Sequence, residues 1–222
     1  MSYLLGVDSA APFTEARWAA VLSVLGRKPD AVGRPADGPD ALTEAEIPLL
    51  RQWGVRVWLW GSRTNPKRVG GTLPEGVTYG DEMASSAARL GYRAGCILGA
   101  DFEAVSGWSP TPGWIGGTAY GLMAWGMEPM AYGAPGNWAF DEAFTGARRA
   151  YLSVGRRLQL WAAVWSRPAY PKVPPRTMLD TAHVGVHPAG WQWAGNVPLP
   201  GFPPDEGIDL DLWSEEAGLW TP

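Results

Sequence analysis

The sequence of 222 residues has one cysteine, Cys96, and two histidines, His183 and His187. A single cysteine excludes a disulfide framework and a cysteine-cluster zinc site. The two histidines flank Gly185 in a segment that makes a poor helix, so they offer little for a metal centre or a Ser-His-Asp triad. We therefore expect no metal and no cofactor, and any hydrolytic chemistry falls mainly to carboxylates.

Long apolar runs and a strong charge imbalance are also lacking. No run of about 18 apolar residues occurs, so no membrane span is expected. The first residues, MSYLLGVDSAAPF, lack the basic segment that begins a secretory signal. The formal net charge of −4 argues against a nucleic-acid partner. The chain is expected to be a monomer.

Tryptophan, glycine and proline are abundant, with 14, 29 and 21 residues. The glycines and prolines are not periodic and separate strongly patterned segments, which indicates tight connections in a folded domain. The hydrophobic content of 46% is enough to build a core. Most tryptophans are expected in that core, while some can offer flat faces to sugar rings.

Short apolar segments alternate with amphipathic ones along the chain, which predicts a parallel sheet with right-handed crossovers. The expected strands are 4–10, 31–35, 55–62, 95–104, 128–135 and 158–166, with one or two more in 183–195 and an apolar–acidic tail at 208–213. The expected helices are 13–26, 43–54, 79–91, 114–126 and 141–155, with a long loop at 63–78 and a short helix at 176–182. Thr14 is the expected N-cap of the first helix, and Gly26 is its expected C-cap.

A closed barrel and an open doubly wound sheet both fit this alternation. Seven or eight units favour a single-domain (β/α) TIM-like barrel over residues 1–222, although the chain is short for that fold. The segment GVDSAAP after the first strand matches neither a dinucleotide-binding fingerprint nor a P-loop, which weakens the open-sheet alternative.

Acidic residues lie where strands are expected to end. Asp8 ends the first strand, Asp101 and Glu103 end the fourth, and Asp209 lies in the tail. Because strand side chains alternate, Asp101 and Glu103 share the interior face while Phe102 points outward. Carboxylates crowded into one cleft cannot all ionise, so at least one keeps its proton to higher pH. A protonated acid beside an ionised carboxylate is the pair that glycoside hydrolysis requires.

The segments GVDSA, GADFEA, LWAAVW and WQWAG…IDLDLW resemble the family-25 glycoside hydrolases, which are N-acetylmuramidase lysozymes with an irregular β/α barrel. The segments AVGRP…ALTEAEIPLLRQWGV and MASSAARLG are similar to a sister group of glycoside-hydrolase-like barrels, DUF1906. The resemblance implies that Glu103 is the general acid and that Asp101 is the nucleophile or assists the N-acetyl group of the substrate. It further implies that Asp8 and Asp209 shape the field and bind substrate.

Further substrate-binding residues are expected around the acidic mouth. Arg34 matches the arginine of the DUF1906 group, and a guanidinium there would lower the pKa of nearby carboxyl groups or bind substrate. Aromatic and amide side chains at strand ends would contact sugar rings, and Trp108 and Trp114 would form a cleft wall. The strand-end candidates are Trp60, Tyr132, Trp165, Gln192 and Trp193.

Two hypotheses follow. The first is a retaining β-1,4-glycosidase that acts on bacterial peptidoglycan, as an endolysin-like muramidase that stays cytoplasmic until it is released or leaves by a non-classical route. The second is a catalytically weak barrel that binds cell-wall glycan without cleaving it or serves as an interaction module. A metal-dependent barrel hydrolase is disfavoured by the histidine count.

Overall fold

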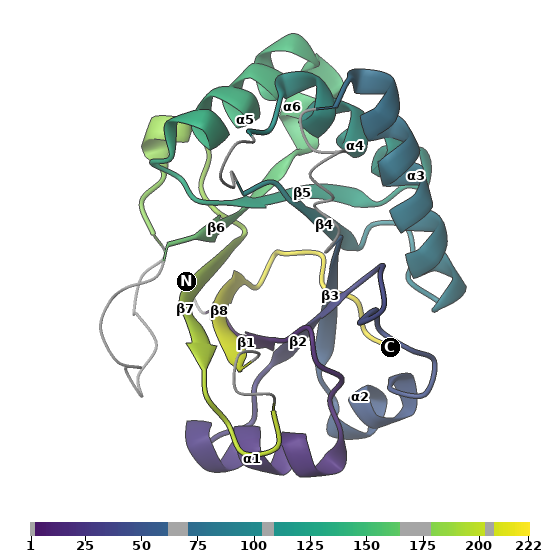
Figure 1. Ribbon diagram of the computed structural model, residues 1–222, viewed down its shortest axis with the longest axis vertical. Helices are drawn as coiled ribbons and strands as arrows, with labels where there is room; N and C mark the ends of the chain where they lie inside the picture. Colours follow the sequence, from purple (N-terminus) through teal and green to yellow (C-terminus); the bar gives the residue numbers. More distant parts are fainter. Residues whose placement is uncertain (1–2, 62–70, 104–108, 165–178, 203–206) are drawn as a thin grey trace.

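The computed structural model describes residues 3–61, 71–103, 109–164, 179–202 and 207–222 (Figure 1). Within these residues, eight strands close into one barrel in the order of the sequence, which confirms the predicted barrel. The strands are β1 (Tyr3–Asp8), β2 (Ala31–Pro35), β3 (Arg56–Gly61), β4 (Ile97–Asp101), β5 (Glu128–Gly133), β6 (Gln159–Ala163), β7 (Gly190–Val197) and β8 (Ile208–Ser214).

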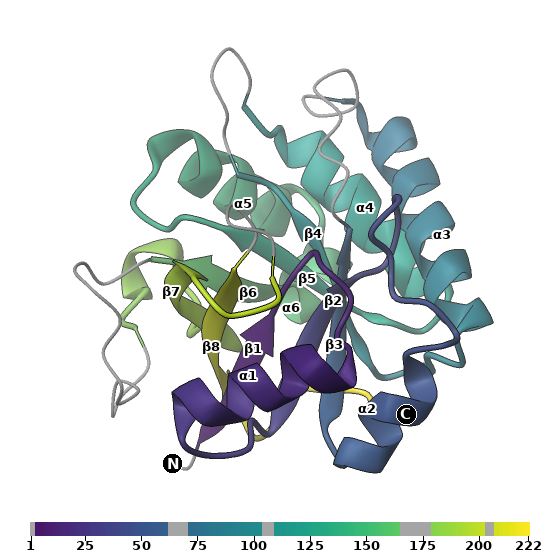
Figure 2. The same cartoon turned by 60° about the horizontal axis from the view of Figure 1, so that its bottom comes forward.

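Helices cover the barrel on two sides. Figure 1 shows α3 to α6 on one side and α1 and α2 on the other, and Figure 2 turns α1 and α2 forward. In the described part of the chain, no helix has the length and apolar character needed to cross a membrane. The helices are α1 (Glu15–Leu25), α2 (Ile47–Trp53), α3 (Leu73–Arg89), α4 (Pro112–Ala124), α5 (Trp138–Ala150) and α6 (Leu152–Arg157), with a 3₁₀ turn η1 (Ala182–Val184).

The prediction of an all-parallel sheet is wrong for the last strand. Strands β1 to β7 are parallel, whereas β8 runs antiparallel to both β7 and β1. The link from β7 to β8 spans only residues 198–207, which is short for a crossover that returns a strand in parallel. The consequence for the site is direct, because antiparallel β8 brings Asp209 opposite Asp8 at the end of β1.

Three tryptophans fill the barrel interior. The ring centroids of Trp58, Trp161 and Trp213 lie between 4.8 and 5.9 Å apart. A Cβ atom on Gly6 would lie 2.8 Å from Trp58, and one on Gly190 would lie 2.6 Å from Trp213, so both strands need glycine where these rings approach. The rings form a solid apolar floor, and polar groups are left for the rim.

The first helix agrees with its sequence signals, and the second begins later than predicted. Thr14 Oγ1 accepts a hydrogen bond from the backbone N–H of Arg17, and Gly26 ends α1 with a φ of 67°. The segment 43–54 becomes helical only at Ile47, because Pro48 is tolerated in a first helical turn but not in a helix interior.

The loop predicted at 63–78 is also wrong in part, because α3 already begins at Leu73. Thr72 and Glu75 form a capping box at its start. A Cβ atom on Gly76 or Gly80 would clash with the backbone of α4. The glycines therefore permit a close crossing of α3 and α4. The helix predicted at 141–155 is divided at residue 151 into α5 and α6.

Candidate active site

A cavity of about 320 Å³ opens at the barrel rim where β1 and β4 end. Its volume lies within the range of small-molecule sites. The four acids singled out in the sequence all contribute to its wall, although β1, β4 and β8 are far apart in the chain. The lining residues are Asp8, Ser9, Ala10, Trp60, Asp101, Glu103, Tyr132, Trp161, Gln192, Asn196, Gly207 and Asp209.

Strand alternation explains which acids face inward. On β4, Ile97 packs with the interior tryptophans, and Asp101 lies four residues further on the same face. Phe102 is buried in the outer core between the barrel and the helices. Asp101 Oδ1 accepts a hydrogen bond of 2.8 Å from the backbone N–H of Glu103, which sets the chain direction just beyond the strand.

An amide from β7 ties the acids of β1 and β8 together. Gln192 Nε2 donates to Asp8 Oδ2 at 3.2 Å and to Asp209 Oδ2 at 2.9 Å. Its Oε1 accepts a 2.6 Å hydrogen bond from the Tyr132 hydroxyl on β5. Asp209 Oδ1 accepts the backbone N–H of Asn196 at 2.6 Å, and Asn196 has a left-handed φ of 54°. Four strands therefore hold one polar network at the rim.

The carboxyl groups of Asp101, at the end of β4, and of Glu103, just beyond it, have raised pKa values. Burial raises the pKa of Asp101 from 3.8 to about 6, and the hydrogen bond from Glu103 N–H opposes this rise. Burial raises the pKa of Glu103 from 4.5 to about 7, with further increases from the negative charges of Asp101 and Asp209. Glu103 thus holds its proton to higher pH than Asp101.

The carboxyl groups of β1 and β8 are perturbed in the same direction. Burial raises the pKa of Asp8, of Asp209 and of Asp211, and the negative charge of Asp209 raises the pKa of the other two. Asp211 lies two residues beyond Asp209 on β8 and is fully buried. Sequence reasoning did not select it, although the alternation of the IDLDLW tail places both acids on one face.

Aromatic rings complete one wall of the cavity. Trp60 and Tyr132 line it as the sequence suggested. Trp161 lines it too, with its ring 4.4 Å from Tyr132 and 5.7 Å from Trp60, but was not selected. Trp161 and Ala163 are two residues apart on β6 and share its interior face, so strand alternation was the signal that could have identified Trp161. Trp165, chosen in its place, lies outside the described residues.

Two other aromatic predictions need correction. Trp193 is 1% exposed and packs in the outer core, because alternation along β7 turns Gln192 toward the cavity and Trp193 away from it. Trp114 does not wall the cleft: it lies in α4, where its buried ring stacks on Tyr79 of α3 at 5.5 Å. Trp108 lies outside the described residues.

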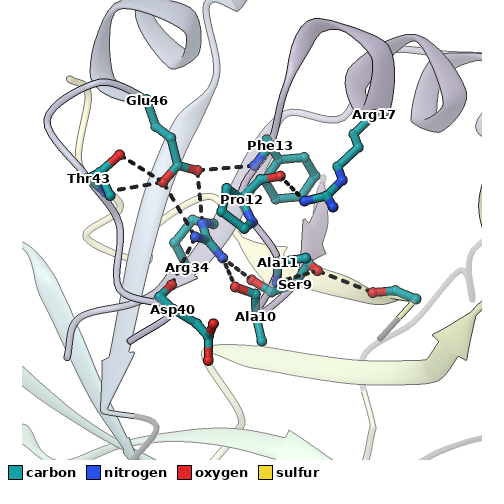
Figure 3. A network of polar contacts seen from close by, with 11 residues as sticks. Ser9, Ala10, Ala11, Pro12, Phe13, Arg17, Arg34, Asp40, Thr43 and Glu46 are labelled. Carbon is teal, nitrogen blue, oxygen red and sulfur yellow. Dashed lines mark hydrogen bonds and ion pairs between the residues drawn. The ribbon is translucent and has the colours of Figure 1, made fainter. Parts of the chain in front are cut away.

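Arg34 does not line the cavity, contrary to prediction. Figure 3 shows its guanidinium among polar contacts with Ser9, Ala10 and Glu46. Alternation along β2 turns Gly33 inward against Trp58 and Arg34 outward. The fully buried guanidinium pairs with Glu46, with Nε 3.1 Å from Oε2. It also donates to the carbonyl oxygens of Ser9 and Ala10, which line the cavity.

Arg34 therefore supports the site from behind. Its guanidinium anchors the turn that follows Asp8, and Glu46 Oε2 also accepts the backbone N–H of Phe13 at 3.1 Å. Burial lowers the pKa of Arg34, an effect that the charge of Glu46 opposes. The carboxyl groups of the cavity are thus not neutralised by this cation, and their pKa values rise.

No metal cluster occurs in the part of the chain that the structure describes, where no three His, Cys, Asp or Glu residues are arranged to hold an ion. The chemistry available at the rim is that of carboxyl groups with unequal proton affinities beside aromatic rings.

Comparison with known proteins shows the same fold class. Neither a protein-family model nor a curated protein matches the sequence. An uncharacterized protein of B. stearothermophilus superimposes with a TM-score of 0.83 at 23% identity, covering 98% of this chain and 100% of that one. A family 25 glycosyl hydrolase from Bacillus anthracis gives 0.53 at 14% identity, covering 96% and 90%. The autolysin LytC from Streptococcus pneumoniae, in complex with synthetic peptidoglycan ligand, gives 0.57 at 13% identity, covering 96% and 47%.

These likenesses show the barrel fold that the chain shares with these proteins. The resemblance to the DUF1906 group remains a prediction.

Proposed function

We propose that this protein is a retaining glycosidase that cleaves β-1,4 bonds of bacterial peptidoglycan, with a muramidase-like activity. The observation that carries the proposal is the pair of Asp101 and Glu103 in one cavity, with pKa values raised to about 6 and about 7. Near pH 6.5, between these two values, Asp101 is mostly ionised and Glu103 is mostly protonated, because a pKa difference of one unit means a roughly tenfold difference in proton affinity.

In the proposed reaction, Glu103 donates its proton to the glycosidic oxygen as the bond to the leaving sugar breaks. Asp101 stabilises the positive charge that develops at the anomeric carbon, either as the nucleophile or by orienting the N-acetyl group of the substrate. Water then attacks, and Glu103 accepts a proton from it. The first step uses both carboxyl groups in the protonation states that their surroundings favour near pH 6.5, and Glu103 recovers its proton in the second step.

The rest of the cavity suits a sugar. The rings of Trp60, Tyr132 and Trp161 lie together along one wall and can contact the C–H faces of a pyranose. Asp8 and Asp209, held by Gln192, offer oxygen atoms to sugar hydroxyl groups. Peptidoglycan is proposed as the substrate because LytC, which shares the fold, has been solved with a synthetic peptidoglycan ligand.

The decisive test is hydrolysis of purified peptidoglycan, followed by turbidity and by the reducing ends released. Glu103→Gln is expected to lower the rate at least about 100-fold, because it removes the general acid. Glu215→Gln, a change at an exposed carboxylate, is expected to clear at the wild-type rate. Reducing ends that carry muramic acid would establish the muramidase bond, and glucosamine ends would refute it.

If wild type and Glu103→Gln clear peptidoglycan equally slowly, the hydrolase proposal fails. Sedimentation of the protein with insoluble peptidoglycan would then test the glycan-binding alternative. Bound protein that releases no reducing ends would identify a binding module.

A further inference from the structure

One buried carboxyl group lies below the cavity, and the proposed reaction gives it no role. Asp211 is 0% exposed, and its Oδ1 accepts a 2.8 Å hydrogen bond from the Trp161 indole N–H. Its Oδ2 is buried and receives no donor from backbone or from ordinary side-chain N–H and O–H groups among the described residues. A buried carboxylate oxygen without a donor is costly, so a hydrogen must come from elsewhere.

The neighbouring carboxyl group of Asp8 is the one positioned to supply that hydrogen. In the antiparallel pairing of β1 with β8, Asp8 lies opposite Asp209 and Gly6 lies opposite Asp211, so Asp211 is the diagonal neighbour of Asp8 on the interior face. The negative charge of Asp211 contributes to the raised pKa of Asp8, so the two groups lie close enough to interact. Two carboxyl groups so placed can form a hydrogen bond only when one of them carries a proton.

The remaining partners indicate which group holds the proton. Asp211 already accepts the Trp161 N–H, which favours its ionised form. Asp8 is 4% exposed and its Oδ2 accepts one hydrogen bond from Gln192. Asp8 therefore has an oxygen left to carry a hydrogen, and Asp211 Oδ2 has a free acceptor position to receive it.

We propose that Asp211 is a positioning residue that shares one proton with Asp8, so that Asp8 presents a neutral carboxyl group to the cavity. The pair then holds one negative charge instead of two, and that charge lies at the deeper residue, Asp211. This inference rests on the proposed function only for its effect on Glu103. With Asp8 neutral, Glu103 faces fewer negative charges and can still ionise near neutral pH to act as a base.

Other groups around the pair do not provide a competing cation. No Lys, Arg or His is among the described residues that line the cavity. The titratable groups that face Asp8 and Asp211 from other positions are Asp209 on β8, Asp101 at the end of β4, Glu103 just beyond β4, and Tyr132 on β5. The carboxyl groups among them strengthen the preference for a shared proton when they are ionised, whereas the Tyr132 phenol has a raised pKa and stays neutral.

The test is Asp211→Asn, which keeps the shape and the acceptor for the Trp161 N–H but offers Asp8 an amide donor in place of an acceptor. Carbon-detected NMR of the aspartate carboxyl groups follows the titration of Asp8 directly. In wild type the Asp8 midpoint is expected well above the ordinary value, and in Asp211→Asn it is expected to fall by at least about 1 pH unit. Glu215→Gln is the matched surface control and is expected to leave the midpoint unchanged.

A kinetic readout separates positioning from mere support of the fold. In Asp211→Asn the negative charge moves from position 211 to Asp8, nearer the cavity, so the alkaline limb of kcat/KM, which reports Glu103, is expected to move to higher pH. A second variant, Trp161→Phe, removes the indole donor and is expected to weaken the preference of Asp211 for the ionised form.

The outcomes distinguish this inference from the proposed function. If Asp8 titrates near its ordinary value in folded wild-type protein, or if its midpoint is the same in Asp211→Asn, the shared proton is refuted even when peptidoglycan is cleaved. If the Asp8 midpoint falls as expected but wild type releases no reducing ends, the shared proton stands and the hydrolase proposal fails.

Discussion

Replacing Asp101 by asparagine is expected to stabilise the fold, and to do so more at pH 8 than at pH 4. The folded protein raises the pKa of Asp101 from 3.8 to about 6, so the folded state binds this proton more tightly than the unfolded state does. For an acid with a raised pKa, stability is greatest below the unfolded value and falls as the pH rises toward the folded value. Above that pH the full cost of ionising a buried group remains.

The magnitude follows from the two titration midpoints. The pKa of Asp101 differs by about 2 units between the folded and unfolded states, and each unit is worth roughly 1.4 kcal/mol. Ionisation of Asp101 therefore lowers the free energy of unfolding by about 3 kcal/mol at pH 8 and by about 0.5 kcal/mol at pH 4. Asp101→Asn removes the ionisation and keeps an oxygen to accept the Glu103 N–H. The variant should therefore gain about 2.5 kcal/mol more stability at pH 8 than at pH 4. Since Asp101 keeps a small accessible face toward the cavity, this is an upper figure.

Thermal unfolding at both pH values measures the effect. For a chain of this size, about 2.5 kcal/mol corresponds to a rise in Tm of roughly 5–10 °C relative to wild type at pH 8, with little change at pH 4. Glu215→Gln controls for the loss of one surface charge. An Asp101→Asn variant whose Tm advantage is independent of pH, or is larger at pH 4, would refute the argument that ionisation of the buried Asp101 carboxyl group destabilises the folded protein.

Three further outcomes are expected. The rate of peptidoglycan cleavage should follow a bell-shaped pH profile with its maximum between about pH 6 and 7, because Asp101 must be ionised and Glu103 protonated; a rate that keeps rising to pH 9 would contradict these roles. Arg34→Gln should lower the free energy of unfolding by about 3–5 kcal/mol, because it leaves the buried carboxylate of Glu46 unpaired. Arg27→Gln breaks an exposed pair with Asp30 and should lower it by at most about 1 kcal/mol, both measured by urea denaturation. Gly80→Ala should lower Tm by the equivalent of about 1–3 kcal/mol, since the added methyl group meets the backbone of α4; an unchanged or higher Tm would show that the two helices move apart freely.

Local sequence patterns predicted much of the fold. Apolar segments separated by glycine and proline located the barrel strands, and Thr14 and Gly26 marked the ends of α1 as the structure has them. These signals are local because strand alternation and helix caps depend on a few neighbouring residues. The same alternation indicated that Asp101 and Glu103 share a face, since it requires no knowledge of a partner strand.

Other features depended on distant segments. The tail alone does not say that β8 runs antiparallel, and only that direction places Asp209 opposite Asp8. Arg34 was judged by its family resemblance, whereas the register of β2 against its neighbours turns it away from the cavity and onto Glu46. The start of α3 lies within the predicted loop 63–78, and the reason for its glycines, a close crossing with α4, depends on a helix about forty residues further along the chain.

By itself, then, the amino-acid order determined that this chain alternates strands and helices, and that acids end the strands whose carboxyl ends meet at a barrel rim. Tertiary structure alone decided which acids touch, how deeply each is buried and which proton each one keeps. The reason is physical: periodicity is a property of adjacent residues, whereas desolvation and charge repulsion depend on every group that folding brings within a few ångströms.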